Sequence, residues 1–503
     1  MNRILYIIIP LIIQASTVAA FNPDTLHTMA LLGIDFASSL QFHKAVEVFD
    51  QMITLDPANP QPHFLKSAAY FWMYSADMHN DQLGEEFKKY SDQAIEVAEA
   101  KLEKDENDID ALFYLGGSYG SLGRYYGIKK SYLNAYWFGK KGVNILEEVV
   151  EKDSTYYDAY LGLGIYHYLA DVLPRFVKML SFILGIEGDR ERGIKELNLA
   201  VEKGVYTKSE AMFFLGAIYT YREREFDKAM NIWNTLLKKY NNNPGVLIHK
   251  GATYARMGYC EEALRTFHKV LDAINKEMLI PVSSIHYQMG NVCFKMSDFA
   301  HAIEAFSKSI ETDTLFSGNR RWTYPWSHYW LGQSYELLGD RQKARYYYQK
   351  VEENDSERAF EHAREQLTNP YQLPDVKLTL VRNYISCSQF DQALAILDQE
   401  LPGLLAEDTD YNRKKRMEID YYKSQILYKK GQFNSAIHHF NEILTNKNSE
   451  EQWFKYWGYF YRGKSYQNLG MVEKALDDYE LAGDSEDRSL QERIKKEYML
   501  LGR

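Results

Sequence analysis

One pattern of glycine, small and aromatic residues recurs along most of this 503-residue chain, and it limits the fold more than any other feature. The stretch that begins at Leu331 shows it clearly: Gly332 is followed by Tyr335, and Ala344 is followed by Tyr348. A glycine lets two helices of a hairpin approach closely, and the tyrosine one turn later fills the next layer. The alanine on the second helix accepts that approach, and the aromatic residue four positions on reaches the neighbouring hairpin. The pattern therefore predicts a helical hairpin as the repeating unit.

Eleven positions in the chain correspond to Gly332, and eleven correspond to Ala344. The first set comprises Gly33, Ser67, Gly116, Gly164, Gly216, Gly251, Gly290, Gly332, Val381, Ser424 and Gly463. The second set comprises Ala45, Ala94, Gly142, Gly193, Ala229, Ala263, Ala302, Ala344, Ala393, Ala436 and Ala475. We therefore expect an all-α fold of about eleven hairpins. Because the chain has only 12 Pro and 30 Gly, the hairpins should stack as one continuous right-handed superhelix.

The interval between the two positions of a pair changes along the chain. It is 12 residues from Gly33 to Ala45, but 27 from Ser67 to Ala94, and it stays long for the next two pairs. The excess corresponds to about two additional turns on each helix. We therefore expect three elongated hairpins in the N-terminal half, stacked as a second lobe. In the C-terminal half the links between hairpins lengthen instead, with the main interruption at residues 357–374.

With these spacings the sequence closely resembles tetratricopeptide repeats, which implies a solenoid of such hairpins. A narrower resemblance covers residues 110–204. Leu173-Pro174, the apolar run after it and the turn from Gly188 to Glu191 are similar to the tetratricopeptide-repeat protein 39 / inclusion-body clearance family. Exported bacterial repeat proteins share the segment 158–168 just upstream. These resemblances imply an adaptor scaffold without an assigned reaction, and the intracellular roles of the eukaryotic members should not transfer.

The first twenty residues have the pattern of a signal peptide. Arg3 supplies a positive start, Ile4 to Ile13 is almost wholly apolar, and Val18 and Ala20 are the small residues that a signal peptidase accepts. Cleavage before Phe21 is the favoured interpretation, and an uncleaved anchor is the alternative. No cysteine follows the site, so the chain is not a lipoprotein. We expect an exported protein of the periplasm or cell envelope.

The sequence therefore divides into four expected ranges: the signal peptide at 1–20, an array with elongated hairpins at 21–204, a regular array at 205–355 and a C-terminal array at 356–503. Inside the third long hairpin, an apolar patch is formed by Phe176, Met179, Leu180 and Ile183. These side chains are too apolar for a solvated helix. They either pack beneath the neighbouring extensions or form an exposed surface for a partner or a membrane.

Composition and motifs argue against several classes of function. A net charge of −10 without a long basic run argues against a nucleic-acid partner. Three cysteines form neither a disulfide framework nor a zinc site, and their odd number predicts at least one free thiol. Residues 458–465 match a phosphate-binding loop formally, but their aromatic residues and their register with the repeat indicate a helix. No metal site, cofactor site or catalytic constellation is predicted.

The remaining surface suggests a binding role. In this fold the first helices line a concave groove, where we expect these residues: Phe213, Tyr287, Asn291, Phe294, Trp326, Tyr329, Gln333, Trp457 and Phe460. Aromatic grooves suit extended or helical peptides, although each ring could instead wedge between adjacent hairpins. The leading hypothesis is a non-catalytic scaffold that binds a protein or peptide partner. The alternatives are an apolar-ligand or membrane-surface protein that uses residues 176–184, and an enzyme that uses the elongated lobe.

Overall fold

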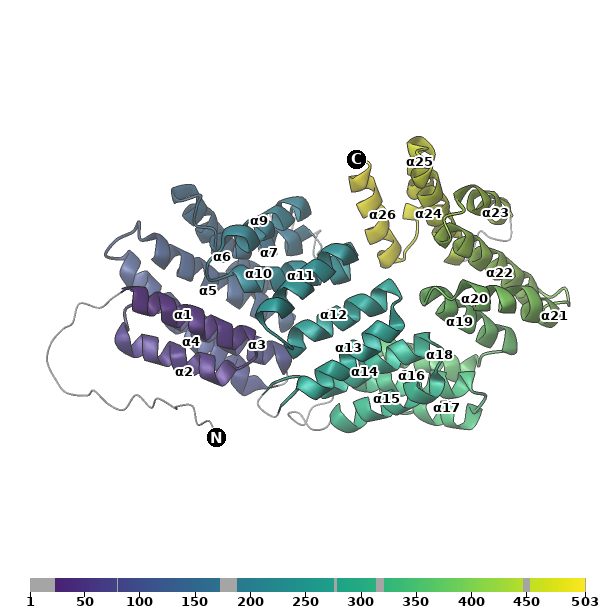
Figure 1. Ribbon diagram of the computed structural model, residues 1–503, viewed down its shortest axis with the longest axis horizontal. Helices are drawn as coiled ribbons and strands as arrows, with labels where there is room; N and C mark the ends of the chain where they lie inside the picture. Colours follow the sequence, from purple (N-terminus) through teal and green to yellow (C-terminus); the bar gives the residue numbers. More distant parts are fainter. Residues whose placement is uncertain are drawn as a thin grey trace, which may run out of the picture. The chain divides into compact units, whose positions relative to one another are not determined.

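The computed structural model describes residues 23–78, 80–171, 188–275, 278–313, 321–446 and 453–502. Every regular element in these ranges is a helix (Figure 1). The chain divides into two compact units, one built from residues 1–75 and 81–208, the other from residues 76–80 and 209–503. Residues 209–355 and 356–503, which were expected as two arrays, thus share one unit. The signal peptide and the apolar patch of Phe176, Met179, Leu180 and Ile183 lie outside the described residues.

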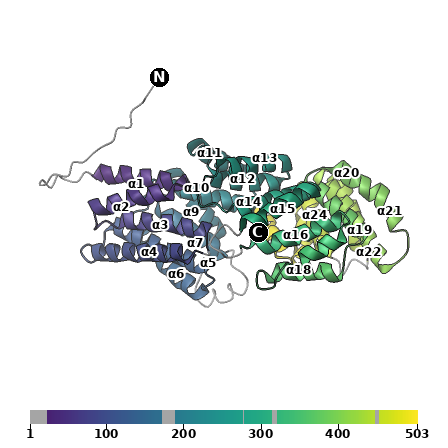
Figure 2. The same ribbon diagram turned by 90° about the horizontal axis from the view of Figure 1, so that it is seen from below.

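The first unit is built from helices that follow one another as hairpins. They are α1 (Pro23–Ser38), α2 (Phe42–Leu55), α3 (Pro60–Ala76), α4 (Asp81–Leu102), α5 (Ile109–Ile128), α6 (Tyr132–Lys152), α7 (Ala159–Asp171) and α9 (Arg190–Lys203). The pairs α1/α2, α5/α6 and α7/α9 pack along their lengths. Helices α1 to α4 lie side by side in both views of the ribbon (Figures 1 and 2).

The second unit repeats this arrangement with shorter helices and longer links. Its elements are α10 (Lys208–Ile218), η1 (Tyr219–Glu223), α11 (Phe226–Lys239), α12 (Pro244–Met257), α13 (Cys260–Ala273), α14 (Val282–Lys295), α15 (Phe299–Asp313), α16 (Thr323–Leu337), α17 (Arg341–Tyr348), α18 (Glu357–Thr368), α19 (Leu373–Ser386), α20 (Phe390–Ala395), η2 (Ile396–Glu400), α21 (Leu401–Leu404), α22 (Asp410–Lys429), α23 (Phe433–Thr445), α24 (Trp453–Asn468), α25 (Val472–Gly483) and α26 (Arg488–Leu500). The expected all-α fold of helical hairpins is confirmed.

The repeated glycine has a direct packing role. A Cβ atom at Gly332 would lie 2.4 Å from Cε1 of Tyr348, and one at Gly290 would lie 2.6 Å from Cε1 of Phe306. The aromatic ring of the second helix thus covers the glycine of its own hairpin, a contact that the sequence analysis did not foresee. The ring also reaches the next hairpin, as expected, because Phe306 stacks on Trp330 with centroids 6.5 Å apart. Each ring therefore fixes one hairpin and joins it to its neighbour.

We predict that Gly290→Ala lowers the free energy of unfolding by about 1–3 kcal/mol, because the new methyl group forces the buried Phe306 ring out of its position. Urea unfolding followed by circular dichroism measures this change. Gly483→Ala is the matched control, since no atom lies within 4 Å of a Cβ at that helical position. Equal stability of Gly290→Ala and the unsubstituted protein would contradict the packing role.

The elongated hairpins follow the expected spacing in two cases and depart from it in the third. Helices α5 and α6 contain 20 and 21 residues, and α4 contains 22, whereas α12 contains 14. The described helices of the third hairpin, α7 and α9, contain only 13 and 14 residues. The amide of Asp189 donates to the carbonyl of His167 at 3.1 Å, so α9 begins beside the end of α7. The extra length of this hairpin therefore falls at residues 172–187, outside the described residues.

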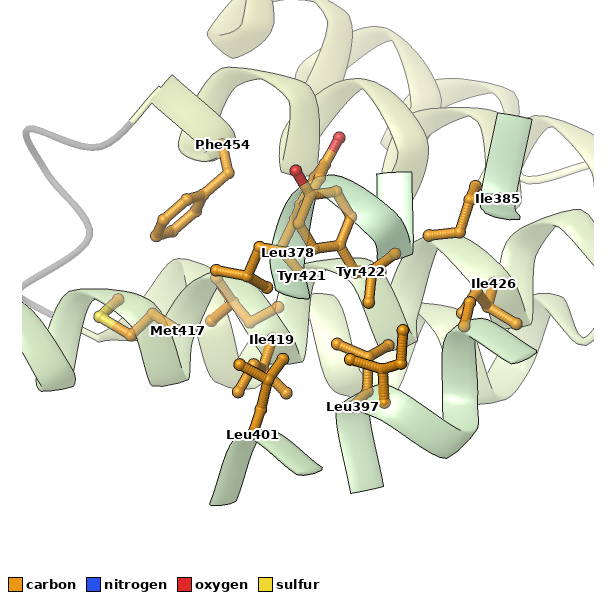
Figure 3. Close-up of a cluster of buried hydrophobic side chains, with 14 of the residues drawn as sticks. Leu378, Ile385, Leu397, Leu401, Met417, Ile419, Tyr421, Tyr422, Ile426 and Phe454 are labelled. Atoms are coloured by element: carbon orange, nitrogen blue, oxygen red, sulfur yellow. The ribbon is translucent and has the colours of Figure 1, made fainter. Parts of the chain in front are cut away.

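Buried hydrophobic side chains of α19 to α24 form a core within the second unit. Tyr421 and Tyr422 on α22 lie among Leu378, Leu397 and Phe454, as Figure 3 shows. The interruption expected at residues 357–374 contains a helix, α18, whose Ala359 and Ala363 pack against Tyr348. The sequence indicated a break there, and the structure shows an inserted helix instead, because small residues four apart give α18 a face that fits the preceding hairpin.

The last helix returns to the first elements of the same unit. The Lys496 ammonium group donates to the carbonyl oxygen of Glu223, and it lies 3.9 Å from Oε1 of Glu225. Arg222 forms an ion pair with Glu492 at 3.5 Å. Helix α26 and η1 are therefore in contact although more than 260 residues separate them in sequence, and Figure 1 shows α26 near α11.

Candidate functional site

Five of the nine expected groove residues are buried within the second unit. Their exposed fractions are 9% for Tyr287, 6% for Phe294, 9% for Tyr329, 2% for Gln333 and 4% for Phe460. Trp330 Nε1 donates to the Tyr287 hydroxyl at 3.3 Å, and Gln333 Nε2 donates to the Tyr348 hydroxyl at 2.9 Å. These groups hold adjacent elements together, which is the wedging role that the sequence left open. They offer little surface to a partner.

The other four expected residues, Phe213, Asn291, Trp326 and Trp457, are half-buried. The Trp326 ring meets Tyr329 edge-on at 5.7 Å and lies 5.9 Å from His362 of α18. The Trp457 indole donates to Asp487 at 3.1 Å. The two tryptophans belong to different hairpins and different hydrophobic clusters. With Phe213 and Asn291, they are the expected residues that stay partly accessible.

The structure adds a feature that the sequence analysis missed, a group of cations on several hairpins of the second unit. This basic cluster consists of Arg224, Arg256, Lys295, Lys429 and Arg493. Arg224 follows η1, Arg256 lies in the last turn of α12, Lys295 and Lys429 end α14 and α22, and Arg493 lies within α26. The return of α26 to η1 accounts for the proximity of Arg493 to Arg224.

Besides burial, neighbouring cations contribute to the lowered pKa values of three members of the cluster, Arg224, Lys295 and Lys429. Burial, followed by the charges of Arg493 and Arg256, lowers the pKa of Arg224 to about 10. Burial, followed by Arg224 and Arg493, lowers the pKa of Lys429. The side chains of Arg224, Arg256 and Lys429 are nevertheless exposed, and those of Lys295 and Arg493 are half-buried. Protein atoms thus surround Arg224, Arg256 and Lys429 closely enough to weaken the hydration of their charges while water still reaches them.

Aromatic rings support three of the cations. Arg256 lies over Tyr221 at 4.9 Å from the ring centroid, Arg493 over Trp457 at 5.0 Å, and Arg224 over Phe226 at 5.6 Å. Such contacts orient a guanidinium group and leave its N–H donors available at the edge. Trp457, an expected groove residue, therefore supports Arg493 of the basic cluster with the face of its ring.

Sequence reasoning passed over this cluster for a physical reason. A cation in the last turn of a helix is commonly explained by its favourable interaction with the helix dipole. A signal was present, since Arg256, Lys295 and Lys429 each stand near the end of the first helix of a hairpin. Only the folded chain shows that these ends gather in one place.

Other candidate sites have ordinary structural explanations. The residues that resemble a phosphate-binding loop, 458–465, lie within helix α24. Lys464 forms an ion pair with Glu497 at 2.8 Å, and Gly463 is covered by Tyr479. Across the described ranges, no three His, Cys, Asp or Glu side chains are gathered as metal ligands, and no helix is long and apolar enough to span a bilayer.

Comparisons with known proteins identify the repeat. Models of the tetratricopeptide repeat match residues 283–314, which contain all but the first residue of α14 and all of α15, and residues 326–357, which contain most of α16 and all of α17. A search of curated proteins returns no match.

Solved structures resemble the chain at low sequence identity. Pseudomonas aeruginosa pilF is 14% identical with a TM-score of 0.35, and the match covers 50% of this chain and 97% of that one. Human IFIT1, solved as a dimer with PPP-AAAA, is 16% identical with a TM-score of 0.34, covering 92% of this chain and 95% of that one. Yeast Tom70 is 13% identical with a TM-score of 0.33, covering 93% and 91%. The chain thus contains tetratricopeptide repeats within an all-helical array of hairpins.

Proposed function

We propose that this protein is a non-catalytic scaffold or adaptor of the cell envelope that binds protein segments. The observation that carries the proposal is the pair of tetratricopeptide repeats at residues 283–314 and 326–357, since such repeats typically mediate protein–protein interactions. The resemblance of residues 110–204 to an adaptor family points the same way. Hairpin packing uses repeat glycines such as Gly290 and Gly332 and the aromatic rings that cover them. Binding therefore depends on the side chains that stay accessible.

Within this proposal the accessible aromatic surface contributes to binding. Trp326 and Trp457 are half-buried, and tryptophan supplies large contact area at a low cost in side-chain entropy. The buried residues Tyr287, Phe294, Tyr329, Gln333 and Phe460 hold the supporting surface in place. A partner segment would contact the tryptophan edges and the neighbouring polar groups.

We predict that Trp326→Ala together with Trp457→Ala reduces the amount of partner captured from an envelope extract by about tenfold or more, because the truncation of an interface tryptophan typically costs that much affinity. Quantitative mass spectrometry of the captured proteins measures the change. Trp137→Ala is the control, since that ring is 70% exposed in the first unit. If the double variant retains every partner, the aromatic surface is not the binding site.

Export rests on the N-terminal sequence. Arg3, the apolar run from Ile4 to Ile13 and the small residues Val18 and Ala20 support a cleaved signal peptide. We predict that the protein recovered from an envelope fraction begins at Phe21, because signal peptidase cuts after Ala20. N-terminal sequencing tests this. A chain that still begins at Met1 in the membrane fraction would favour the uncleaved anchor, and one found only in the cytoplasm would contradict export.

A further inference from the structure

The basic cluster lacks the carboxylates that usually accompany buried or crowded cations. None of its five members forms an ion pair with a carboxylate among the described residues, and after burial the neighbouring cations contribute to the lowered pKa values of Arg224, Lys295 and Lys429. Nearby acids are engaged elsewhere: Glu492 pairs with Arg222, Glu225 lies beside Lys228 and Lys496, and Glu497 pairs with Lys464. The whole chain has a net charge of −10, so this local excess of positive charge is opposite in sign to the charge of the protein as a whole.

Helix dipoles do not explain the gathering. They stabilise a cation at each helix end separately, and the effect falls off within one turn. Arg493 lies in the middle of α26, away from either end. The repulsion between cations from η1, α12, α14, α22 and α26 is instead relieved when an anionic group lies between them. An anionic group placed among these cations would therefore be stabilised by several of them at once.

The chemistry of the cluster favours several anionic groups along one short segment. Guanidinium groups of Arg224, Arg256 and Arg493 can bind carboxylates or phosphates in a bidentate manner, and the two lysines add point charges. Single-stranded nucleic acid fits less well, because it requires open aromatic faces for its bases. Arg256 and Arg493 already cover faces of Tyr221 and Trp457. The overall negative charge would also repel a long polyanion.

We propose that Arg224, Arg256, Lys295, Lys429 and Arg493 form a binding site for an acidic protein segment, in which closely spaced Asp, Glu or phosphorylated side chains supply the carboxylates or phosphates that the cluster lacks. This inference rests on the proposed scaffold function and names the chemistry of its partner. It also gives Trp457 a role, since its ring positions Arg493 at the site.

The test uses the full-length protein and a fluorescein-labelled Glu-rich peptide. Fluorescence anisotropy at low salt should show binding to this peptide but not to a Gln-rich peptide of equal length, and the affinity should fall as salt rises. Arg256→Gln with Lys429→Gln should weaken binding about tenfold or more, because two charge-assisted contacts are lost. Both side chains are exposed, so the variant should fold. Lys238→Gln with Lys269→Gln, an exposed pair outside the cluster, should change the affinity less than about twofold.

Three results would overturn this assignment. One is equal binding of the Glu-rich and Gln-rich peptides, and another is equal weakening by the two double variants. A third is tighter, cluster-dependent binding of an oligothymidylate, which would assign the site to nucleic acid. The same variants in the envelope pulldown separate the two proposals, with Trp326→Ala used alone because Trp457 contacts Arg493. Partners that are retained by Arg256→Gln with Lys429→Gln but lost by Trp326→Ala would support the scaffold and contradict the acidic-segment site.

A second inference comes from an independent observation, the approach of two cysteines that are 127 residues apart. The Sγ atoms of Cys260, the first residue of α13, and Cys387, which follows α19, lie 2.6 Å apart. The backbones also meet here, since a Cβ at Gly258 would lie 2.6 Å from the carbonyl oxygen of Ser386. The third cysteine, Cys293, is buried, and burial raises its pKa to about 11. The pair is therefore placed for covalent bonding and Cys293 is not.

We propose that Cys260 and Cys387 form a disulfide by exchange with a disulfide donor such as oxidised glutathione. The half-buried Cys387 thiolate attacks a sulfur of the donor and releases one thiolate. Cys260, after loss of its proton, attacks the Cys387 sulfur of the mixed disulfide and releases the second thiolate. Two protein thiols are thus oxidised and one donor disulfide is reduced to two thiols. The cross-link would join α13 to α19 across several hairpins.

Peptide mapping under non-reducing conditions tests this after incubation of the folded protein with oxidised glutathione. We expect a linked Cys260–Cys387 peptide and alkylated Cys293, and a midpoint of thermal unfolding several degrees higher than in the reduced protein. The hydrogen bond from Cys260 lowers the pKa of Cys387 to about 7. The reaction should therefore accelerate as pH rises through this value, because the thiolate fraction grows.

Cys293→Ser should keep the cross-link and Cys387→Ser should abolish it. A folded Cys293→Ser protein in which both remaining cysteines stay alkylatable after oxidation would contradict the proposal. So would a glutathione adduct on Cys387 that persists without resolution by Cys260.

Discussion

The contact between the last helix and the first elements of the second unit determines what this unit can do. Lys496 reaches the carbonyl of Glu223, and Arg222 pairs with Glu492. Exposed ion pairs of this kind contribute at most about 1 kcal/mol each to stability. Their importance is that they place α26 beside η1. Helix α26 is held by Leu490 and Ile494, which are buried against the preceding hairpin. Through this contact Arg493 joins cations from hairpins far away in sequence.

Hairpin packing and surface chemistry make use of different residues. Glycine, alanine and one aromatic ring per hairpin are used inside the fold, as Gly332 and Tyr348 show. The same packing buries Tyr329 and Phe460, so abundant aromatic residues do not by themselves produce an aromatic groove. Charged residues at helix ends remain outside this packing. The basic cluster therefore arises where the repeat places few constraints on residue type.

The sequence predicted the hairpins well because their signal is local. The spacing from Gly332 to Ala344 is set within one hairpin, and the cap of α9 is local as well, since the Asp189 side chain accepts from the amide of Arg192. The inserted helix α18 was expected only as an interruption, since it has no counterpart in the other repeats. Of the expected groove residues, the structure buries five and leaves Phe213, Asn291, Trp326 and Trp457 half-buried. Whether an aromatic ring at a given repeat position is exposed to solvent depends on which residues of other hairpins pack against it. The sequence of one hairpin does not contain that information.

The two inferred sites depend even more on tertiary structure. The sequence does not pair Cys260 with Cys387, because the two cysteines are 127 positions apart. The cations of the basic cluster are also ordinary when considered one at a time. Their common location follows from the path of the whole second unit. Sequence periodicity therefore predicts the hairpins of the scaffold. The position of the basic cluster instead depends on the contact of α26 with η1.

The most direct test of this account is a zero-length cross-linking experiment on the folded, full-length protein. A carbodiimide joins an ammonium group to a carboxylate only when the two are in contact. The account predicts a cross-link between Lys496 and Glu225, whose charged atoms are 3.9 Å apart, together with the internal reference between Lys464 and Glu497 at 2.8 Å. Recovery of the reference cross-link without the one between Lys496 and Glu225 would show that α26 does not return to η1. The basic cluster would then not exist as a single site.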